Sequence, residues 1–500
     1  MNMTIRRAIS MALVAGVAIP ATVSATNGMV SHGWGTKSKA MAGVAAALPQ
    51  DTLVGATNPA GMAFVGNSLD LGVAFFSPSD RGYKANNDFA TQTYPGTSDQ
   101  VPAGFVVTPG EYDSDLDWFM IPSFGYNRVL NDQMTVGISV FGNGGMNTKY
   151  KDRAVWENFA YAPNQRVAIT SQGGFPLFDT STGHVGAPIT NPNVTQVPLP
   201  DGSVAPVFNG NPDGVFKATL PTGINLEQLF IEIPFTYKVN ERNSFGIAPV
   251  FAYQTFEAWG LEPFRQLSVH PTSVSNNGED SSYGFGVHLG WVGEINDQLT
   301  LGASYRSRVW MSEFDDYEGL FAEEGDFDIP PMLVLGLSYK AMPNLTLAFD
   351  YQRIFYGDIA SLSNSNAIDP SACGVQGAKP DYCLGGNNGL GFGWDSMDVF
   401  KFGARWDYDP KWSFMGGVSY ASDFAPGGQA LFNVLAPATI KWHITLGATY
   451  RHSATDEFNL SLAYMPKETI DGSNVDITGS QTGSIYMEQK DIEISWTHRF

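Results

Sequence analysis

The sequence predicts an all-β protein, a 14-stranded antiparallel transmembrane β-barrel with an N-terminal hatch, or plug, inside its lumen. The observations behind this are a short apolar leader that ends at Ala25, paired strands joined by short polar turns, and a last strand whose apolar residues alternate up to Phe500. A bilayer offers the backbone no water, so only helices or closed barrels can span it. No apolar run after the leader is long enough for a membrane helix, which leaves the barrel.

The first 25 residues have the organisation of a secretory signal peptide. Arg6 and Arg7 precede an apolar run, and small residues stand before Thr26. A membrane anchor is the alternative, but about 12 apolar residues fall short of the ~20 that cross a bilayer as a helix. We therefore expect cleavage near Ala25, export, and a location in the bacterial outer membrane.

Candidate strands alternate between tight polar turns and long loops, which is typical of outer-membrane barrels with periplasmic turns and extracellular loops. Their even number agrees with that topology. Fourteen candidates occur, at 68–76, 116–128, 133–143, 227–239, 244–257, 282–295, 299–312, 328–341, 345–357, 396–408, 411–421, 439–452, 456–466 and 486–500. A large soluble β protein is the alternative for the composition, which is 13% aromatic and includes 54 glycines.

Residues 440–451 show best which face meets lipid, because successive side chains of a strand point to opposite sides. One face is apolar and the other polar or small. The apolar face, expected to touch lipid, consists of Ile440, Trp442, Ile444, Leu446, Ala448 and Tyr450. The other, expected to face the lumen, consists of Lys441, His443, Thr445, Gly447, Thr449 and Arg451. Trp442 and Tyr450 would stand roughly 20 Å apart in height, near the spacing of the aromatic girdles.

Residues 26–66 lack strand alternation and contain 15 Gly or Ala in 41 positions. Ser38 is a candidate cap for a short helix over 39–48, and Asp51 for a second one before Asn58-Pro59. Fourteen strands enclose a lumen too wide for their own side chains to fill, so we expect this segment to plug it. A disordered periplasmic tail is the alternative. The predicted domains are a signal peptide at 1–25, the hatch at 26–66 and the barrel at 67–500.

The charge and the cysteines limit the possible partners. The formal net charge of −21 becomes −23 once Arg6 and Arg7 leave with the leader, which argues against nucleic acid. Acidic loops could instead bind lipid and lipopolysaccharide through divalent cations. Cys373 and Cys383 lie in one Gly/Asn-rich loop and predict a disulfide, with two free thiols as the alternative. No histidine cluster lies nearby, so we expect neither a metal nor a cofactor.

Two common hydrolase motifs do not occur in the sequence. Neither Gly-x-Ser-x-Gly nor His-Glu-x-x-His occurs, and the seven histidines are scattered. We therefore expect no enzyme, with an in-membrane hydrolase as the alternative. An adhesin-like structural barrel is the other alternative, suggested by a long loop after the third strand. The C-terminal strand ending in Phe500 predicts recognition by the barrel-assembly machinery.

Several stretches resemble the FadL-type outer-membrane long-chain fatty-acid transporters and their relatives that take up aromatic hydrocarbons. They are GWGTKSKAMAGVAAALPQDTLVGATNPAGMAF at 33–64, GISVFGNGGMNTKY at 137–150, PATIKWHITLGATY at 437–450 and the terminal strand. The resemblance implies a hatch that carries the Asn58, Pro59, Ala60 motif. It also implies a third strand that bends inward and opens a lateral window, here at Phe141, Gly142, Asn143, Gly144 and Gly145. Glycine inside a strand marks a bulge or a close approach; an end of the strand is the alternative.

The resemblance implies passive uptake of hydrophobic molecules, most of all long-chain fatty acids, with lateral release into the bilayer; aromatic or alkane hydrocarbons are the alternative cargo. A continuous apolar path avoids exposing cargo to water at about 0.8 kcal/mol per CH₂. Candidate lining residues are Trp259, Leu261, Phe264, Leu320 and Phe321, for which packing within the loops is the alternative. Ser139 matches the position that holds a carboxylate. Lys441, Arg306, Arg405 and Arg451 project inward by parity, where solvated or salt-bridged wall residues are the alternative.

Overall fold

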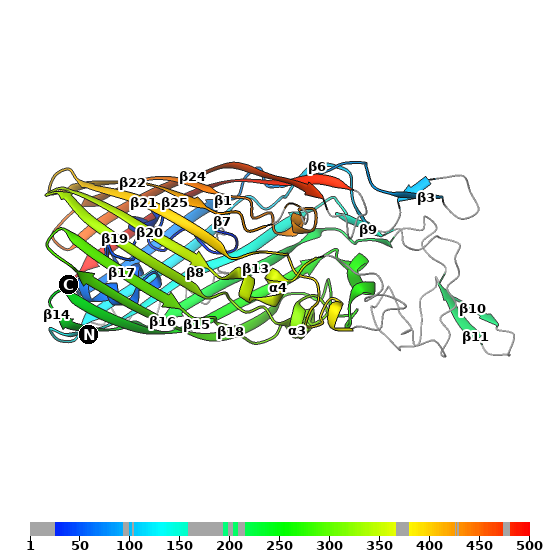
Figure 1. Ribbon diagram of the computed structural model, residues 1–500, viewed down its shortest axis with the longest axis horizontal. Helices are drawn as coiled ribbons and strands as arrows, with labels where there is room; N and C mark the ends of the chain where they lie inside the picture. Colours follow the sequence, from blue (N-terminus) through cyan, green and yellow to red (C-terminus); the bar gives the residue numbers. More distant parts are fainter. Residues whose placement is uncertain are drawn as a thin grey trace.

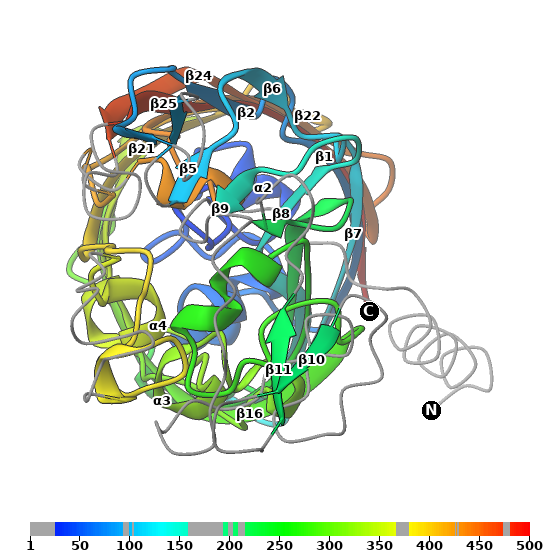
Figure 2. The same ribbon diagram turned by 90° about the vertical axis from the view of Figure 1, so that its right-hand side faces the viewer.

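The computed structural model describes residues 26–93, 100–102, 105–158, 194–198, 204–208, 216–366, 380–425, 427, 430–473 and 481–500. The predicted signal peptide at 1–25 lies outside this part of the chain. The strands form a closed antiparallel barrel, seen from the side in Figure 1 and along its axis in Figure 2. Short turns lie at the end where the chain terminates, and long loops extend from the opposite end (Figure 1). The predicted fold class is therefore confirmed.

Fourteen antiparallel strands build the wall, and each matches one of the predicted strands. The barrel closes because β1 pairs with both β7 and β25. The wall strands are β1 (Ser68–Ser77), β7 (Phe119–Val129), β8 (Met134–Tyr150), β13 (Thr222–Glu232) with its continuation β14 (Phe235–Asn240), β15 (Asn243–Trp259), β16 (Asp280–Glu294), β17 (Leu299–Arg306), β19 (Met332–Met342), β20 (Leu345–Ile354), β21 (Met397–Asp407), β22 (Trp412–Ala421), β23 (Trp442–Arg451), β24 (Asp456–Ser473) and β25 (Thr482–Arg499). The fourth strand is interrupted at Pro234, which has no N–H to donate.

Short elements lie outside the wall. The strands β2 (Gly82–Ala85) and β6 (Gly110–Asp113) pair with each other, and β2 also pairs with the start of β25. The other short strands are β3 (Thr91–Thr93), β4 (Gln100–Pro102), β5 (Phe105–Val107), β9 (Trp156–Asn158), β10 (Val194–Pro198), β11 (Val204–Phe208), β12 (Phe216–Lys217) and β18 (Trp310–Met311). The loop helices are η3 (Glu262–Leu267), η4 (Asp315–Tyr317), α3 (Ala322–Gly325), η5 (Tyr356–Asp358), α4 (Ala360–Ser363), η6 (Pro380–Tyr382) and η8 (Phe432–Leu435). Within the described chain no helix combines the length and hydropathy of a membrane span.

The predicted parity holds along β23. Ile444 and Leu446 are 50% and 63% exposed on the outside, whereas His443 and Thr445 are buried on the lumen side. The prediction for Ile440 is wrong. We expected this side chain to face lipid, but it is buried against Met465 and Met487, because β23 begins only at Trp442. Apolar side chains thus cover the outer face of the wall and polar ones the inner face.

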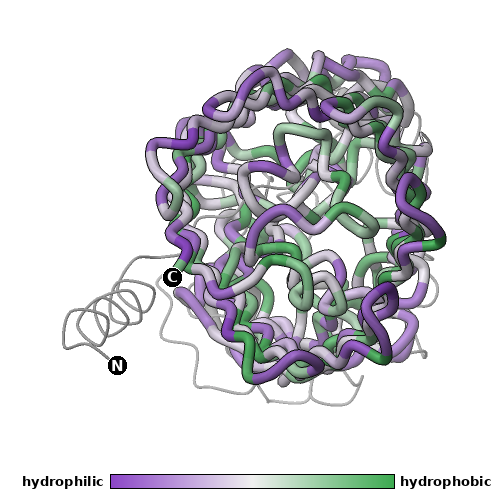
Figure 3. Tube along the Cα trace, turned by 90° about the vertical axis from the view of Figure 1, so that its left-hand side faces the viewer, coloured by the Kyte–Doolittle hydropathy of each residue, from purple (hydrophilic) through white to green (hydrophobic). Residues whose placement is uncertain are grey.

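Residues 26–66 lie inside the barrel, where the chain crosses the lumen (Figures 2 and 3). They form the helix α2 (Thr36–Lys39) and the 3₁₀ helices η1 (Thr52–Ala56) and η2 (Pro59–Phe64). Asp51 caps η1 as predicted, since its carboxylate accepts from the Leu53 N–H at 3.1 Å. The predicted helix capped by Ser38 is wrong. Ser38 lies within α2, which ends before Ala42 and Gly43 because both adopt a left-handed conformation.

Candidate functional site

The Asn58-Pro59-Ala60 motif fastens the hatch to itself and to the wall. Asn58 Nδ2 donates to the Ala46 carbonyl at 2.8 Å and to the Trp291 carbonyl on β16 at 2.9 Å. Its Oδ1 accepts from the Ala60 N–H at 3.1 Å and so caps η2. The hydroxyl of Thr236 on β14 donates to the Pro59 carbonyl at 2.9 Å. One fully buried asparagine thus binds three backbone groups, two in the hatch and one in the wall.

Two buried lysines tie α2 to the last two strands. Lys39 Nζ lies 3.0 Å from Asp491 Oδ2 and 2.8 Å from Glu493 Oε2, both on β25. Lys37 forms an ion pair with Glu457 on β24. Burial alone would lower the pKa of Lys39, but the carboxylates of Asp491 and Glu493 outweigh it and hold that pKa above its ordinary value. The hatch therefore supplies the cations that the buried carboxylates of β24 and β25 require.

The third wall strand, β8, leaves its neighbour β7 partway along. The β7–β8 ladder covers only residues 135–140 of β8, whereas the pairing with β13 continues to Tyr150. The β8–β13 register shifts between Gln228 and Leu229, so that Asn143 is an extra, bulged residue. The strand therefore does not end at the glycines, and the wall lacks a β7–β8 ladder beside 141–148.

The hatch packs against this bulge from inside. Val30 forms an antiparallel bridge with Gly144, and the Gly145 N–H donates to the Met29 carbonyl at 2.8 Å. Trp34 Nε1 donates to the Gly142 carbonyl at 3.2 Å, and its ring lies 5.5 Å from that of Phe141. The segment predicted to open the wall is thus in direct contact with the hatch.

An apolar pocket lies toward the loop end, with about 560 Å³ of empty space including its mouth. Four predicted lining residues meet there, namely Leu261, Phe264, Leu320 and Phe321. Trp259 is not among the lining residues. The remaining lining residues were not predicted: Met146, Trp156, Ile224, Phe256, Ser361, Leu384, Leu390, Gly391, Phe392, Phe432 and Leu435. They come from β8, β13, β15 and separate loops, so no local pattern shows that they meet.

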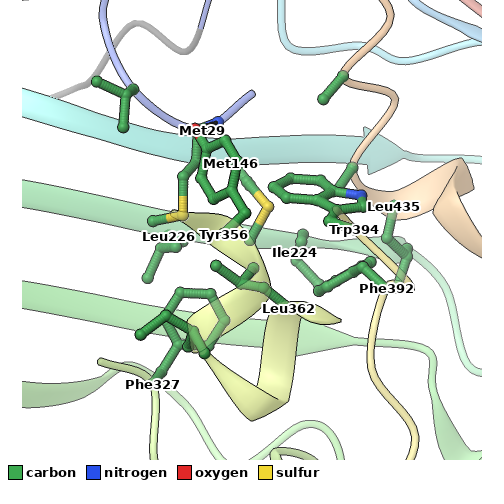
Figure 4. Close-up of a cluster of buried hydrophobic side chains, with 14 of the residues drawn as sticks. Met29, Met146, Ile224, Leu226, Phe327, Tyr356, Leu362, Phe392, Trp394 and Leu435 are labelled. Carbon is green, nitrogen blue, oxygen red and sulfur yellow. Dashed lines mark hydrogen bonds between the residues drawn. The ribbon is translucent and has the colours of Figure 1, made fainter. Parts of the chain in front are cut away.

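A second pocket lies beside the bulge and shares Met146 and Leu435 with the first. Its empty space is about 340 Å³. It is lined by Gly28, Phe76, Pro78, Arg81, Gly145, Met146, Asn147, Leu435, Ala436, Pro437, Ala438, Met487 and Gln489. Figure 4 shows Met146 beside Met29 of the hatch and Tyr356. Met146 and Leu435 therefore stand between the apolar pocket and the space behind the interrupted wall.

The polar residues predicted from the resemblance lie elsewhere. Ser139 is buried under the hatch and donates to the Thr52 carbonyl at 3.0 Å. Lys441 precedes β23 instead of projecting from its luminal face, and pairs with Asp423 at 2.5 Å. Arg405 and Arg451 both pair with Asp407. None of these residues lines either pocket.

Arg306 is the one predicted cation at the bulge. It is 1% exposed, and its Nη2 donates to Asn143 Oδ1 at 2.9 Å. The guanidinium also lies over the rings of Trp34 and Phe230. It therefore holds the bulged residue next to the hatch.

The predicted cysteine pair is only partly within the described residues. Cys383 is buried and disulfide-bonded. Cys373 lies outside the described residues, so the bridge between the two stays a prediction. In the described ranges no group of three or more His, Cys, Asp or Glu residues could hold a metal ion.

Solved structures resemble this chain in fold. The Pseudomonas putida toluene transporter TodX matches with a TM-score of 0.57 at 16% identity over 95% of this chain and 100% of its own. A Pseudomonas aeruginosa FadL homologue matches with a TM-score of 0.56 at 14% identity over 95% and 100%. The Ralstonia pickettii toluene transporter TbuX matches with a TM-score of 0.52 at 16% identity over 94% and 99%. A comparison with curated proteins gave no match.

The family is shown by the sequence itself. The family model described as "Outer membrane protein transport protein (OMPP1/FadL/TodX)" matches residues 221–491, more than half of the chain. Its members are transport channels, so the hydrolase alternative is wrong. This chain therefore belongs to the OMPP1/FadL/TodX family of outer-membrane channels for hydrophobic compounds.

Proposed function

We propose that this chain is a passive channel that binds hydrophobic molecules at the loop end and releases them sideways into the outer membrane, with long-chain fatty acids as its main cargo. The observation that carries the proposal is the sharing of Met146 and Leu435 by the apolar pocket and the pocket beside the β8 bulge. Cargo would pass from the first pocket to the second without entering bulk water, which would cost about 0.8 kcal/mol per CH₂. No energy source is required, because the cargo moves down its gradient.

The lining of the apolar pocket supports a hydrophobic cargo. None of the described residues that line it is charged; Ser361 contributes a hydroxyl and Trp156 an indole N–H. Apolar walls with a few polar groups are typical of small-molecule sites. An alkyl chain of a fatty acid matches such a lining.

Aromatic hydrocarbons are a second candidate cargo. Six aromatic residues line the pocket: Trp156, Phe256, Phe264, Phe321, Phe392 and Phe432. Two of the structures with a similar fold are toluene transporters. An uncharged lining also suits a cargo that has no charge.

Met146→Trp tests the passage between the pockets. We expect it to slow uptake of radiolabelled palmitate and toluene by intact cells of a Gram-negative host that lacks its own channel of this family. The larger tryptophan ring would fill the space between the two pockets. Met134→Trp is the matched control, since Met134 lies on the same strand but is 47% exposed. Equal uptake by Met146→Trp and the control would refute the passage. If cells with the unmodified chain take up the cargo no faster than cells with an empty vector, transport itself is refuted.

A further inference from the structure

The pocket beside the β8 bulge contains one charged side chain. Arg81, in the connection between β1 and β2, lines it and is 6% exposed. Of the described residues that line the two pockets, Arg81 alone carries a charge. A buried charge is costly unless it is paired or solvated. This position therefore requires an explanation.

The hydrogen bonds of Arg81 leave part of its guanidinium without a partner. Nη2 donates to Ser114 Oγ at 3.3 Å and to the Leu116 carbonyl at 2.8 Å. Nε is buried and has no hydrogen-bond partner among the described residues. Both acceptors are neutral, and within the described chain no carboxylate lies at salt-bridge distance from Arg81. The other cations considered above, Lys441, Arg405, Arg451 and Arg306, each have a carboxylate within 4 Å.

Burial lowers the pKa of Arg81 to about 10, despite the opposing effects of Tyr150 and Asp117. The guanidinium therefore stays protonated at neutral pH, with less favourable surroundings than in water. An anion in the pocket would supply the missing charge. Guanidinium groups bind carboxylates with two parallel hydrogen bonds, which suits a group that has a free Nε–H.

The surroundings of Arg81 match an amphiphile with a long tail. Phe76, Met146, Leu435 and Met487 provide apolar walls in the same pocket, and Asn147 adds a polar side chain. Met146 and Leu435 connect this pocket with the wholly uncharged one. A molecule with a carboxylate at Arg81 would thus have an apolar route for its chain.

We propose that Arg81 is the subsite for the carboxylate of a hydrophobic monocarboxylic acid, next to the interrupted wall. This inference rests on the proposed function and adds to it the residue that binds the headgroup of the cargo. The headgroup is held beside the β8 bulge, and the alkyl chain extends past Met146 toward the apolar pocket. Neutral hydrocarbons share the route but gain nothing from Arg81.

The test compares two ligands that differ only in the charge of the headgroup. Equilibrium binding of radiolabelled palmitate and of methyl palmitate is measured on the detergent-purified full chain and on Arg81→Met. We expect Arg81→Met to weaken palmitate binding at least tenfold and to leave methyl palmitate within twofold. Arg81→Lys should restore part of the palmitate affinity. Arg128→Met is the control, because Arg128 is an exposed arginine of the neighbouring strand β7.

The possible outcomes separate the two proposals. Unchanged palmitate binding by Arg81→Met, or an equal loss for both ligands, would overturn the carboxylate subsite. An equal loss would assign Arg81 a structural role through Ser114 and Leu116. If the unmodified chain binds neither palmitate nor methyl palmitate, the proposed function fails before Arg81 is tested.

Discussion

Gly144 of the bulged strand lies against the carbonyl of Met29 in the hatch, so close that a Cβ atom at Gly144 would stand 1.6 Å from the Met29 oxygen. The two segments are also joined by backbone hydrogen bonds on either side. The Gly145 N–H donates to the Met29 carbonyl, and the Ser31 N–H donates to the Asn143 carbonyl at 3.0 Å. The position of the hatch and the shape of the wall are therefore coupled at this point.

Gly144→Ala should displace the hatch from the bulge. Overpacking of this kind costs roughly 1–3 kcal/mol. We expect faster hydrogen exchange at the Ser31 and Gly145 amides and an altered uptake rate, with the barrel still folded. Gly416→Ala is the control, because the nearest atom to its added Cβ would lie at 3.4 Å. Unchanged exchange in Gly144→Ala would contradict the contact.

Asn58→Ala should loosen the hatch at its other end. The substitution leaves the Ala46 and Trp291 carbonyls and the Ala60 N–H without their side-chain partner. Each buried group left unpaired costs about 1–3 kcal/mol. We expect a higher ionic conductance in planar bilayers, because a loosened plug admits ions. Asn131→Ala removes an asparagine from an exposed turn and should leave the conductance unchanged.

Lys39→Met should destabilise the hatch more than any surface charge substitution. It leaves Asp491 and Glu493 buried without their cation, a change that costs about 3–5 kcal/mol. Limited proteolysis should then cut residues 26–66 faster than in the unmodified chain. Adding Asp491→Asn and Glu493→Gln to Lys39→Met should restore protection. A triple variant as sensitive as the single one would show that the charges do not hold the hatch.

His32 should make the hatch less stable in acid. Burial lowers the pKa of His32 well below 6.5, and Lys39, His443 and Lys401 lower it further. The His443 ring stacks on it at 5.5 Å, and none of the four ring nitrogens has a hydrogen-bond partner among the described residues. The unfolded segment therefore takes up a proton that the folded hatch resists, and stability is lost as the pH falls below 6.5.

The measurement is hydrogen exchange at the Ser31 and Lys39 amides between pH 7 and pH 5, after correction for the intrinsic pH dependence. His32→Phe should reduce the extra opening at pH 5. Asp51 acts in the opposite direction, because burial and Asp70 raise its pKa to about 7 and the folded hatch then gains stability as the pH falls. Asp51 is the same in both proteins, so the difference between them reports His32 alone. The same pH dependence in both proteins would contradict the assignment.

The strands and the hatch could be predicted because they depend on local patterns. Alternation along β23 places Ile444 and Leu446 outside and His443 inside, and the alternation is a property of any strand. The prediction failed where the end of an element depends on tertiary contacts. Ile440 and Lys441 precede β23, and Ser38 lies within α2 instead of capping it.

The sequence by itself determined an alternating wall, a small-residue plug and a glycine-rich third strand, because each of these depends on neighbours in the chain. Only the tertiary structure decided that Asn143 is bulged, that β8 leaves β7, and that Met146 and Leu435 join two pockets. Arg81 became a candidate in the same way. Its charge is visible in the sequence, but its burial and its neighbours arise from strands and loops more than 300 residues apart, whose register no local pattern specifies.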